Sequence, residues 1–251
     1  MSAFEFGLLA LLALLGAAVQ AATGFGLSAV VAPYFLLIMN SSAAIQVLAV
    51  ANLTLSLTLV SRVWRSAPRD LLIHLLIGTA VSLPVGLWLF LNADLVTLKR
   101  AVGVVIILFA AILMAGETGI FARRRHQVMR GHTLVEAGVG FVAGILGVSL
   151  TLFAPPIILY MLLVRMGKEE TRALMLTYFM IVYGLATLSH GIAGGMTGAT
   201  WIVAVLLLPF ILAGSWLGHR VGIQLSDFRF RMIILVTLVC SGVYAIATTI
   251  A

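Results

Sequence analysis

The stretch QAATGFGLSAVVAPYFLLIMN, residues 20–40, lies inside a long apolar run that is interrupted by Gly24, Gly26 and Pro33. The core of a soluble domain would not need so many consecutive apolar residues. Glycine and proline are nevertheless poor residues for the interior of a helix, because glycine is flexible and proline lacks an amide donor. The stretch therefore predicts a helix that breaks at membrane depth.

The composition of the whole chain predicts an integral membrane protein. Of its 251 residues, 63% are hydrophobic and only 9% are charged, whereas soluble domains have roughly 25% charged residues. Apolar segments occur at about 4–39, 43–61, 71–92, 95–115, 133–164, 173–193, 199–218 and 232–250. The fold class is therefore all-α, and the single cysteine, Cys240, excludes an intramolecular disulfide.

Two of the apolar segments are too long for one crossing and too short for two ordinary crossings. A membrane-spanning helix needs about 20 residues, whereas segments 4–39 and 133–164 would be about 54 and 48 Å long as straight helices. Both contain residues that disfavour helix in their middle. These are Gly24, Gly26 and Pro33 in the first, and Gly144, Gly147, Pro155 and Pro156 in the second.

The distribution of Lys and Arg favours two hairpins. If both long segments crossed once, the loops would divide the 15 basic residues 7 against 8, which gives no orientation. If both return to the side they entered from, 13 of the 15 lie on one side, which the positive-inside rule makes cytoplasmic. The 13 are Arg62, Arg65, Arg69, Arg123, Arg124, Arg125, Arg130, Arg165, Lys168, Arg172, Arg220, Arg229 and Arg231. Each hairpin is then either a re-entrant pair of half-helices or two short tilted crossings, with both termini outside the cytoplasm.

The two halves have matching features in the same order, and the count of crossings makes the second half inverted. In the first match, Gly24-Phe25-Gly26 and Pro33 align with Gly147-Val148-Ser149 and Pro156 at a constant offset of 123 (147 − 24). In the second match, Gly86-Leu87-Trp88 aligns with Gly214-Ser215-Trp216. We therefore predict a first membrane repeat at 1–116, a basic cytoplasmic linker at 117–132 and a second, inverted repeat at 133–251. Each repeat has a broken-helix hairpin followed by three transmembrane helices.

Paired helix breaks in inverted repeats are typical of secondary transporters. Non-helical backbone in a membrane survives only where protein covers it or where it lines a wet cavity. The N-termini of the half-helices would then point amide donors at that cavity, which favours an anion. The alternative is that the small residues only permit helix packing.

The polar residues at membrane depth are mostly uncharged. They are Gln20, Thr23, Ser28, Asn52, Thr54, Ser56 and Thr58 in the first half and Ser149, Thr151, Thr177, Tyr178, Tyr183 and Thr187 in the second. We expect Asn52 to face the interior. No Asp, Glu, Lys or Arg is placed clearly at mid-membrane, so no coupling residue is evident, and the predicted site has no fixed cation. His74 and His190 are expected to be solvated at the two membrane interfaces.

The motifs ATGFGLSAVVAPYFLLI (residues 22–38) and AGILGVSLTLFAPPIIL (residues 143–159), together with Gly86 and Gly214, resemble the sulfite exporter TauE/SafE family. The resemblance covers nearly the whole chain. It implies a bacterial inner-membrane protein with two homologous halves that transports sulfite, sulfoacetate or related organosulfonates. The family's first motif is usually richer in glycine than this one, where Leu27 and Ser28 follow Gly26.

The sequence therefore predicts a secondary transporter or facilitator that moves small sulfur-containing anions by alternating access, in the export direction. The predicted substrate-binding residues are Gly24, Phe25, Gly26, Ser28, Pro33, Asn52, Gly147, Ser149, Thr151, Pro156 and Thr177. An anion channel of the same fold, or a carrier of a different small anion, is the alternative. We expect no catalytic residues, cofactor, metal or nucleic-acid partner. The expected partners are the anion and membrane lipid, and a homo-oligomer is left open.

Overall fold

The computed structural model describes residues 2–61, 63–117, 131–164, 166–193 and 195–222. Regular structure in these ranges is entirely helical, which confirms the all-α prediction. The α-helices are α1 (Ala3–Thr23), α2 (Leu27–Met39), α3 (Ala43–Val60), α4 (Arg69–Asn92), α5 (Leu95–Glu117), α7 (Thr133–Leu150), α8 (Ala154–Leu163), α9 (Lys168–Ile192) and α10 (Gly198–Gly222), with a short 3-10 helix at Trp64–Ser66. Seven of these are long and apolar enough to cross a membrane, whereas α2 and α8 are shorter. The predicted segment 232–250, with Cys240, and most of the predicted linker lie outside the described residues.

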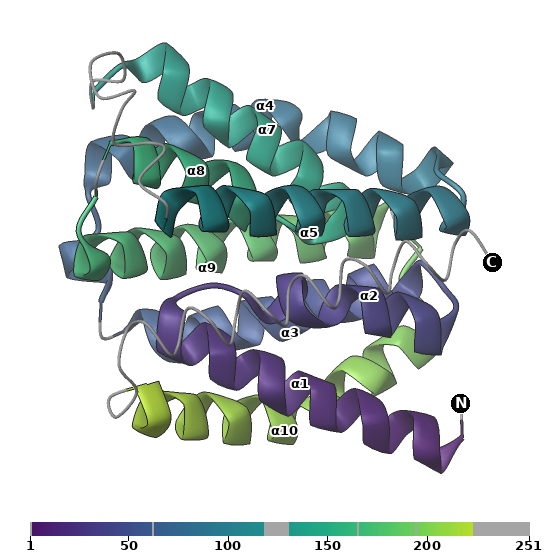
Figure 1. Ribbon diagram of the computed structural model, residues 1–251. Coiled ribbons are helices and arrows are strands. Elements are labelled where there is room, and N and C mark those ends of the chain that lie inside the picture. The colour runs from purple at the N-terminus through teal and green to yellow at the C-terminus, as the bar shows by residue number, and fades with distance from the viewer. Residues whose placement is uncertain (1, 62, 118–130, 165, 194, 223–251) are drawn as a thin grey trace.

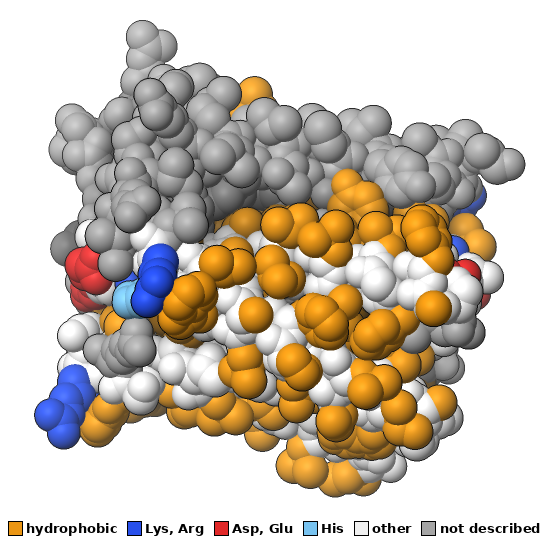
Figure 2. Space-filling view, turned by 90° about the horizontal axis from the view of Figure 1, so that it is seen from below, with side chains coloured by type: hydrophobic (Ala, Val, Ile, Leu, Met, Phe, Trp, Pro, Cys, Tyr) orange, Lys and Arg blue, Asp and Glu red, His pale blue; other side chains and the backbone are white. Residues whose placement is uncertain are grey.

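The helices run back and forth in a bundle, so their ends gather at two opposite ends of the molecule (Figure 1). One end holds the start of α1, the end of α2 and the start of α5. The other holds the end of α3, the starts of α4, α7 and α9 and the end of α10. Figure 2 shows hydrophobic side chains covering the surface between charged side chains at the two ends. This is the surface of a multi-pass membrane protein.

Two closely packed helix pairs join the first half of the chain to the second: α4 with α7, and α1 with α10. Both approach through glycine. A Cβ added at Gly78 would lie 1.9 Å from the Ala137 carbonyl oxygen, and one added at Gly214 would lie 2.1 Å from the Leu14 carbonyl oxygen. Small residues of this kind let helix backbones touch, which drives helix association where lipid removes the hydrophobic driving force.

Helices α3 and α9 pack against each other in the interior of the bundle and are buried over most of their length. Polar side chains at the buried positions of these helices therefore face protein and not lipid, whereas Thr58 of α3 is exposed. Asn52 on α3 is 0% exposed and Tyr183 on α9 is 2% exposed. The expectation that Asn52 faces the interior is confirmed.

Candidate functional site

The first predicted helix break falls between α1 and α2, at Gly24–Gly26. Gly24 and Gly26 have φ angles of 91° and 120°, in the left-handed region that side chains with a Cβ rarely adopt. The turn is stabilised by Thr23, whose hydroxyl accepts the amide of Phe25 at 3.1 Å. These two glycines are therefore required by the turn itself.

Hydrogen-bond donors gather where α2 begins. The amide of Leu27 donates to Gln20 Oε1 at 3.1 Å. The Gln20 side chain is fully buried, and its Nε2 has no hydrogen-bond partner among the described residues. The next amides of α2, those of Ser28 and Ala29, have no carbonyl of their own helix to bind. This end of the helix also has a partial positive charge. The first break therefore has the chemistry of an anion site.

Arg172, in the second turn of α9, brings a full positive charge to the same break. Its Nη2 donates to the carbonyl oxygen of Ala21 at 3.0 Å, and its Cα lies 3.2 Å from where a Cβ of Gly24 would be. Its Nε is buried and has no hydrogen-bond partner within the part of the chain that the structure describes. The sequence predicted a site without a fixed cation, because Arg172 reads there as one of the basic residues of a loop.

The second predicted break falls one helical turn later than Gly147. Helix α7 continues to Leu150, and Thr151 ends it at φ 60° with its amide donating to the Gly147 carbonyl at 2.7 Å. Gly147 lies inside the helix, where an added Cβ would be 2.1 Å from the ring of Phe153. Gly147 therefore permits close packing of the returning chain, and Thr151 makes the turn.

The two breaks differ in the donors they offer. Pro155 and Pro156 follow Ala154 in the first turn of α8. Proline suits this position because the first amides of a helix have no internal acceptor. It also removes two of those amides, so α8 offers fewer donors than α2 does. The symmetry expected of the two half-helices is therefore incomplete in its chemistry.

A buried chain of hydrogen bonds runs between the two breaks. Asn52 Nδ2 donates to Ser28 Oγ at 2.8 Å, Ser28 is hydrogen-bonded to Tyr183, and Tyr183 Oη donates to the Thr151 carbonyl oxygen at 2.9 Å. Because the single Tyr183 proton goes to Thr151, Ser28 must donate to Tyr183. We call these four residues the central chain. It joins α2, α3, α9 and the end of α7. The side chains of Ser28, Asn52 and Tyr183 carry donors that can bind an anion instead, whereas Thr151 takes part through its carbonyl oxygen.

Several other buried polar atoms on α3 and α9 have no hydrogen-bond partner among the described residues. They are Asn52 Oδ1, Ser56 Oγ, Thr187 Oγ1 and His190 Nδ1. Ser56 follows Asn52 by one turn of α3, and Thr187 follows Tyr183 by one turn of α9, so these groups extend the faces that carry the central chain. An unsatisfied buried polar group costs about 1–3 kcal/mol, so each of these groups requires an explanation, such as an ordered water or a functional role.

The expectation that His190 is solvated is wrong. Its side chain is fully buried, and Nε2 lies 3.0 Å from the carbonyl oxygen of Val148 in α7. Because a carbonyl oxygen can only accept, Nε2 carries the proton of this hydrogen bond. The ring also packs edge-to-face on Phe90, with centroids 4.3 Å apart.

The remaining predicted site residues are not linked to the central chain. Phe25 packs against Phe109 of α5, with ring centroids 5.9 Å apart. Pro33 lies buried within α2, and Pro156 is half-buried in α8. Ser149 and Thr177 donate to carbonyl oxygens of their own helices, Ile145 at 2.6 Å and Ala173 at 2.8 Å.

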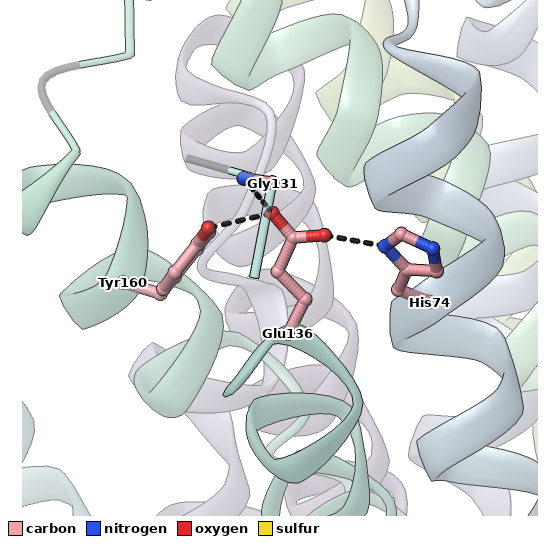
Figure 3. A network of polar contacts seen from close by, with 4 residues as sticks. All are labelled: His74, Gly131, Glu136 and Tyr160. Atoms are coloured by element: carbon pink, nitrogen blue, oxygen red, sulfur yellow. Dashed lines mark hydrogen bonds and ion pairs between the residues drawn. The ribbon is translucent and has the colours of Figure 1, made fainter. Parts of the chain in front are cut away.

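A buried carboxylate that the sequence analysis did not single out lies at the start of α7. Glu136 is 1% exposed. Its Oε2 lies 2.5 Å from Nδ1 of His74 on α4, and its Oε1 accepts Tyr160 Oη of α8 at 2.7 Å and the amide of Gly131 at 3.0 Å (Figure 3). His74 is therefore a hydrogen-bond partner of Glu136 rather than a simple interfacial residue. Among the described residues, no group of three or more His, Cys, Asp and Glu could hold a metal ion.

Helices long and apolar enough to cross a membrane, two helix breaks and a buried polar chain between them are typical of membrane transport proteins for small solutes. The chain belongs to the sulfite exporter TauE/SafE family, whose model matches residues 9–245. Neither the curated proteins nor the solved structures contain a match. The family predicted from the two motifs is therefore confirmed, and with it a role in exporter-type transport of a small anion across a membrane.

Proposed function

We propose that this protein is a secondary transporter that exports small sulfur-containing anions, such as sulfite, sulfoacetate and related organosulfonates, across the bacterial inner membrane. The observation that carries the proposal is the first break, where Arg172, Gln20 Nε2 and the start of α2 present donors and positive charge together. A sulfonate has three acceptor oxygens and low basicity, so it suits several such donors at once. The family is consistent with this substrate class.

The central chain would be the gate between the two sides of the membrane. Its members are fully or almost fully buried, so an anion that reaches Ser28 or Tyr183 must replace one of their hydrogen bonds. Exchange of the Tyr183–Thr151 bond for a bond to the anion would free the end of α7 from α9. The substrate contacts proposed from the sequence are retained, with Ser28, Asn52 and Thr151 at the centre, and Gln20, Arg172 and Tyr183 are added.

Alternating access between two inverted halves is supported by the way the helices pair. Suppose that α1, α2, α3 and α4 of the first half correspond in order to α7, α8, α9 and α10 of the second. The packed pair α1–α10 then corresponds to the packed pair α7–α4, and exchange of the two halves leaves the pair α3–α9 unchanged. The helix ends fit this correspondence. Gly24 and Thr151 are separated by 127 positions (151 − 24), and Gly86 and Gly214 by 128 (214 − 86). Thr151, rather than Gly147, is therefore the better counterpart of Gly24.

The proposed orientation places the basic end of the bundle in the cytoplasm. Arg65, Arg69, Arg172 and Arg220 belong to helix ends at that end of the molecule, and α1 begins at the opposite end. At that opposite end Lys99 Nζ donates to Asn40 Oδ1 at 2.7 Å. The positive-inside rule then puts the N-terminus outside the cytoplasm. With the first break beside Arg172, an anion would enter from the cytoplasm, which is the direction of export.

Flux in proteoliposomes tests the proposal. Purified protein should catalyse saturable uptake of labelled sulfoacetate or sulfite, and unlabelled anion on the far side should accelerate it by exchange. Asn52→Ala should lower exchange at least tenfold, whereas Thr58→Ala, on the exposed face of the same helix, should leave it unchanged. Flux without saturation or exchange would instead favour an anion channel, and the absence of any sulfur-anion flux with intact protein would remove the substrate claim.

A further inference from the structure

The cluster of His74, Glu136 and Tyr160 lies away from the central chain and is not used by the proposed anion path. Glu136 is in the first turn of α7, the arm that enters the second break, and Tyr160 is on α8, the arm that leaves it. The carboxylate therefore joins both arms of this hairpin to α4 (Figure 3). A buried carboxylate in a membrane protein is costly and is characteristically functional.

The groups around the carboxylate identify what it can bind. Within the described residues it meets His74 from α4, Tyr160 from α8 and the amide of Gly131, and the α4 residues one turn earlier, Arg69 and Asp70, are exposed. Tyr160 and Gly131 donate hydrogen bonds to the carboxylate, and His74 presents a ring nitrogen that can carry a proton. A metal cation needs several oxygen ligands, which this set does not supply. The exchangeable ion that fits the site is a proton.

We propose that Glu136 and His74 form the proton-binding site that couples anion export to the proton gradient; this inference rests on the proposed transport function. The His74 side chain is 21% exposed and the Glu136 side chain 2%, so water reaches the imidazole first. A proton that binds His74 Nε2 allows the Nδ1 proton to pass to Glu136 Oε2 over the 2.5 Å contact. One N–H bond forms, one N–H bond breaks and one O–H bond forms. The pair changes from a net charge of −1 to 0.

The structure also shows which contact this proton would change. Helices α4 and α7 are locked together, since a Cβ at Gly140 would lie 2.1 Å from the Leu75 carbonyl oxygen and Thr79 Oγ1 donates to the Gly140 carbonyl at 3.0 Å. The His74–Glu136 contact is therefore fixed. Tyr160 belongs to the shorter helix α8, and its hydrogen bond weakens when the carboxylate loses its charge. Proton binding therefore weakens the hydrogen bond that holds α8 to the carboxylate on α7.

The test uses full-length protein in proteoliposomes with labelled sulfoacetate, whose sulfonate stays ionised throughout the pH range. In the wild type, an imposed pH gradient should accelerate net flux about tenfold over exchange at equal pH, and trapped pH dye should report proton movement. Glu136→Gln should retain exchange but lose the response to the gradient. His74→Gln is the second variant and should lose the same response, and Asp70→Asn, an exposed carboxylate on α4, should behave as wild type.

The outcomes separate this inference from the proposed function. A gradient response in Glu136→Gln equal to that of the wild type overturns the proton site, and so does a wild type that exchanges anion with no response to pH. If no anion flux occurs at all, the proposed function fails, and infrared difference spectra between pH 5 and 8, where an imidazole changes charge, decide the site. A carboxylic-acid band present in the wild type and absent in Glu136→Gln supports it, and a wild type without that band overturns it.

Discussion

Replacing Tyr183 by Phe tests whether the central chain is the anion site. The change removes one hydroxyl that donates to the Thr151 carbonyl at 2.9 Å and accepts from Ser28. Interhelical hydrogen bonds in membrane proteins contribute on average about 0.6 kcal/mol, so the loss of two should destabilise the protein by about 1 kcal/mol. A hydrogen bond to a charged ligand contributes about 1.5–3 kcal/mol. If the Tyr183 hydroxyl of the wild type leaves the Thr151 carbonyl and binds the anion, Tyr183→Phe should raise the Kd for sulfoacetate about 10- to 150-fold.

Tyr178→Phe is the matched control. Tyr178 is on the same helix and is also buried. Its hydroxyl is hydrogen-bonded to Thr79 Oγ1 at 2.6 Å, and Thr79 is not part of the central chain. Its removal should cost similar stability and leave sulfoacetate affinity unchanged. Isothermal titration calorimetry of the purified proteins measures the Kd. Equal affinity in Tyr183→Phe and the wild type, or equal weakening in both variants, would refute the assignment.

Two further predictions concern packing and charge. Gly140→Ala should lower the free energy of unfolding by about 1–3 kcal/mol, as expected for overpacking, because the new Cβ would meet the Leu75 backbone. The control Gly138→Ala meets nothing within 4 Å and should be neutral or raise the free energy of unfolding by up to about 1 kcal/mol. Unfolding midpoints in detergent measure both variants, and equal midpoints would argue against the close α4–α7 contact. Arg172→Gln should weaken sulfoacetate binding by about tenfold or more because it removes a charge-assisted donor, and Arg172→Lys should weaken it less. Calorimetry measures the Kd of both variants. Unchanged affinity in Arg172→Gln would exclude Arg172 from the site.

The elements that depend on local sequence could be predicted well. The apolar segments between residues 4 and 218 and the break at Gly24–Gly26 follow from hydropathy and from the backbone freedom of glycine, and they are observed within the described residues. The second break was displaced by one turn. Gly147 has the residue type of a helix break, but the ring of Phe153 needs the space above it, and Thr151 adopts the left-handed turn instead.

The residues that the sequence could not place are those whose neighbours come from distant parts of the chain. Arg172 reads as a loop cation until α9 packs beside α1 and brings it to the Ala21 carbonyl. Glu136 reads as a residue near a helix end, because only the α4–α7 and α7–α8 contacts reveal His74 and Tyr160 around it. Polarity at membrane depth identified Ser28 and Asn52 as site candidates and Tyr183 only as a polar residue in a helix. Their order in one hydrogen-bonded chain is a property of the tertiary structure.

Accessibility of position 28 from the two sides of the membrane tests the central claim most directly. Ser28→Cys in a Cys240→Ser background would be treated with an anionic, membrane-impermeant thiol reagent from one side at a time. We predict reaction from either side and protection by sulfoacetate from both, because the central chain opens in turn toward each end of the bundle. Reaction from one side only, or reaction that sulfoacetate does not slow, would contradict a gate and substrate site at the central chain.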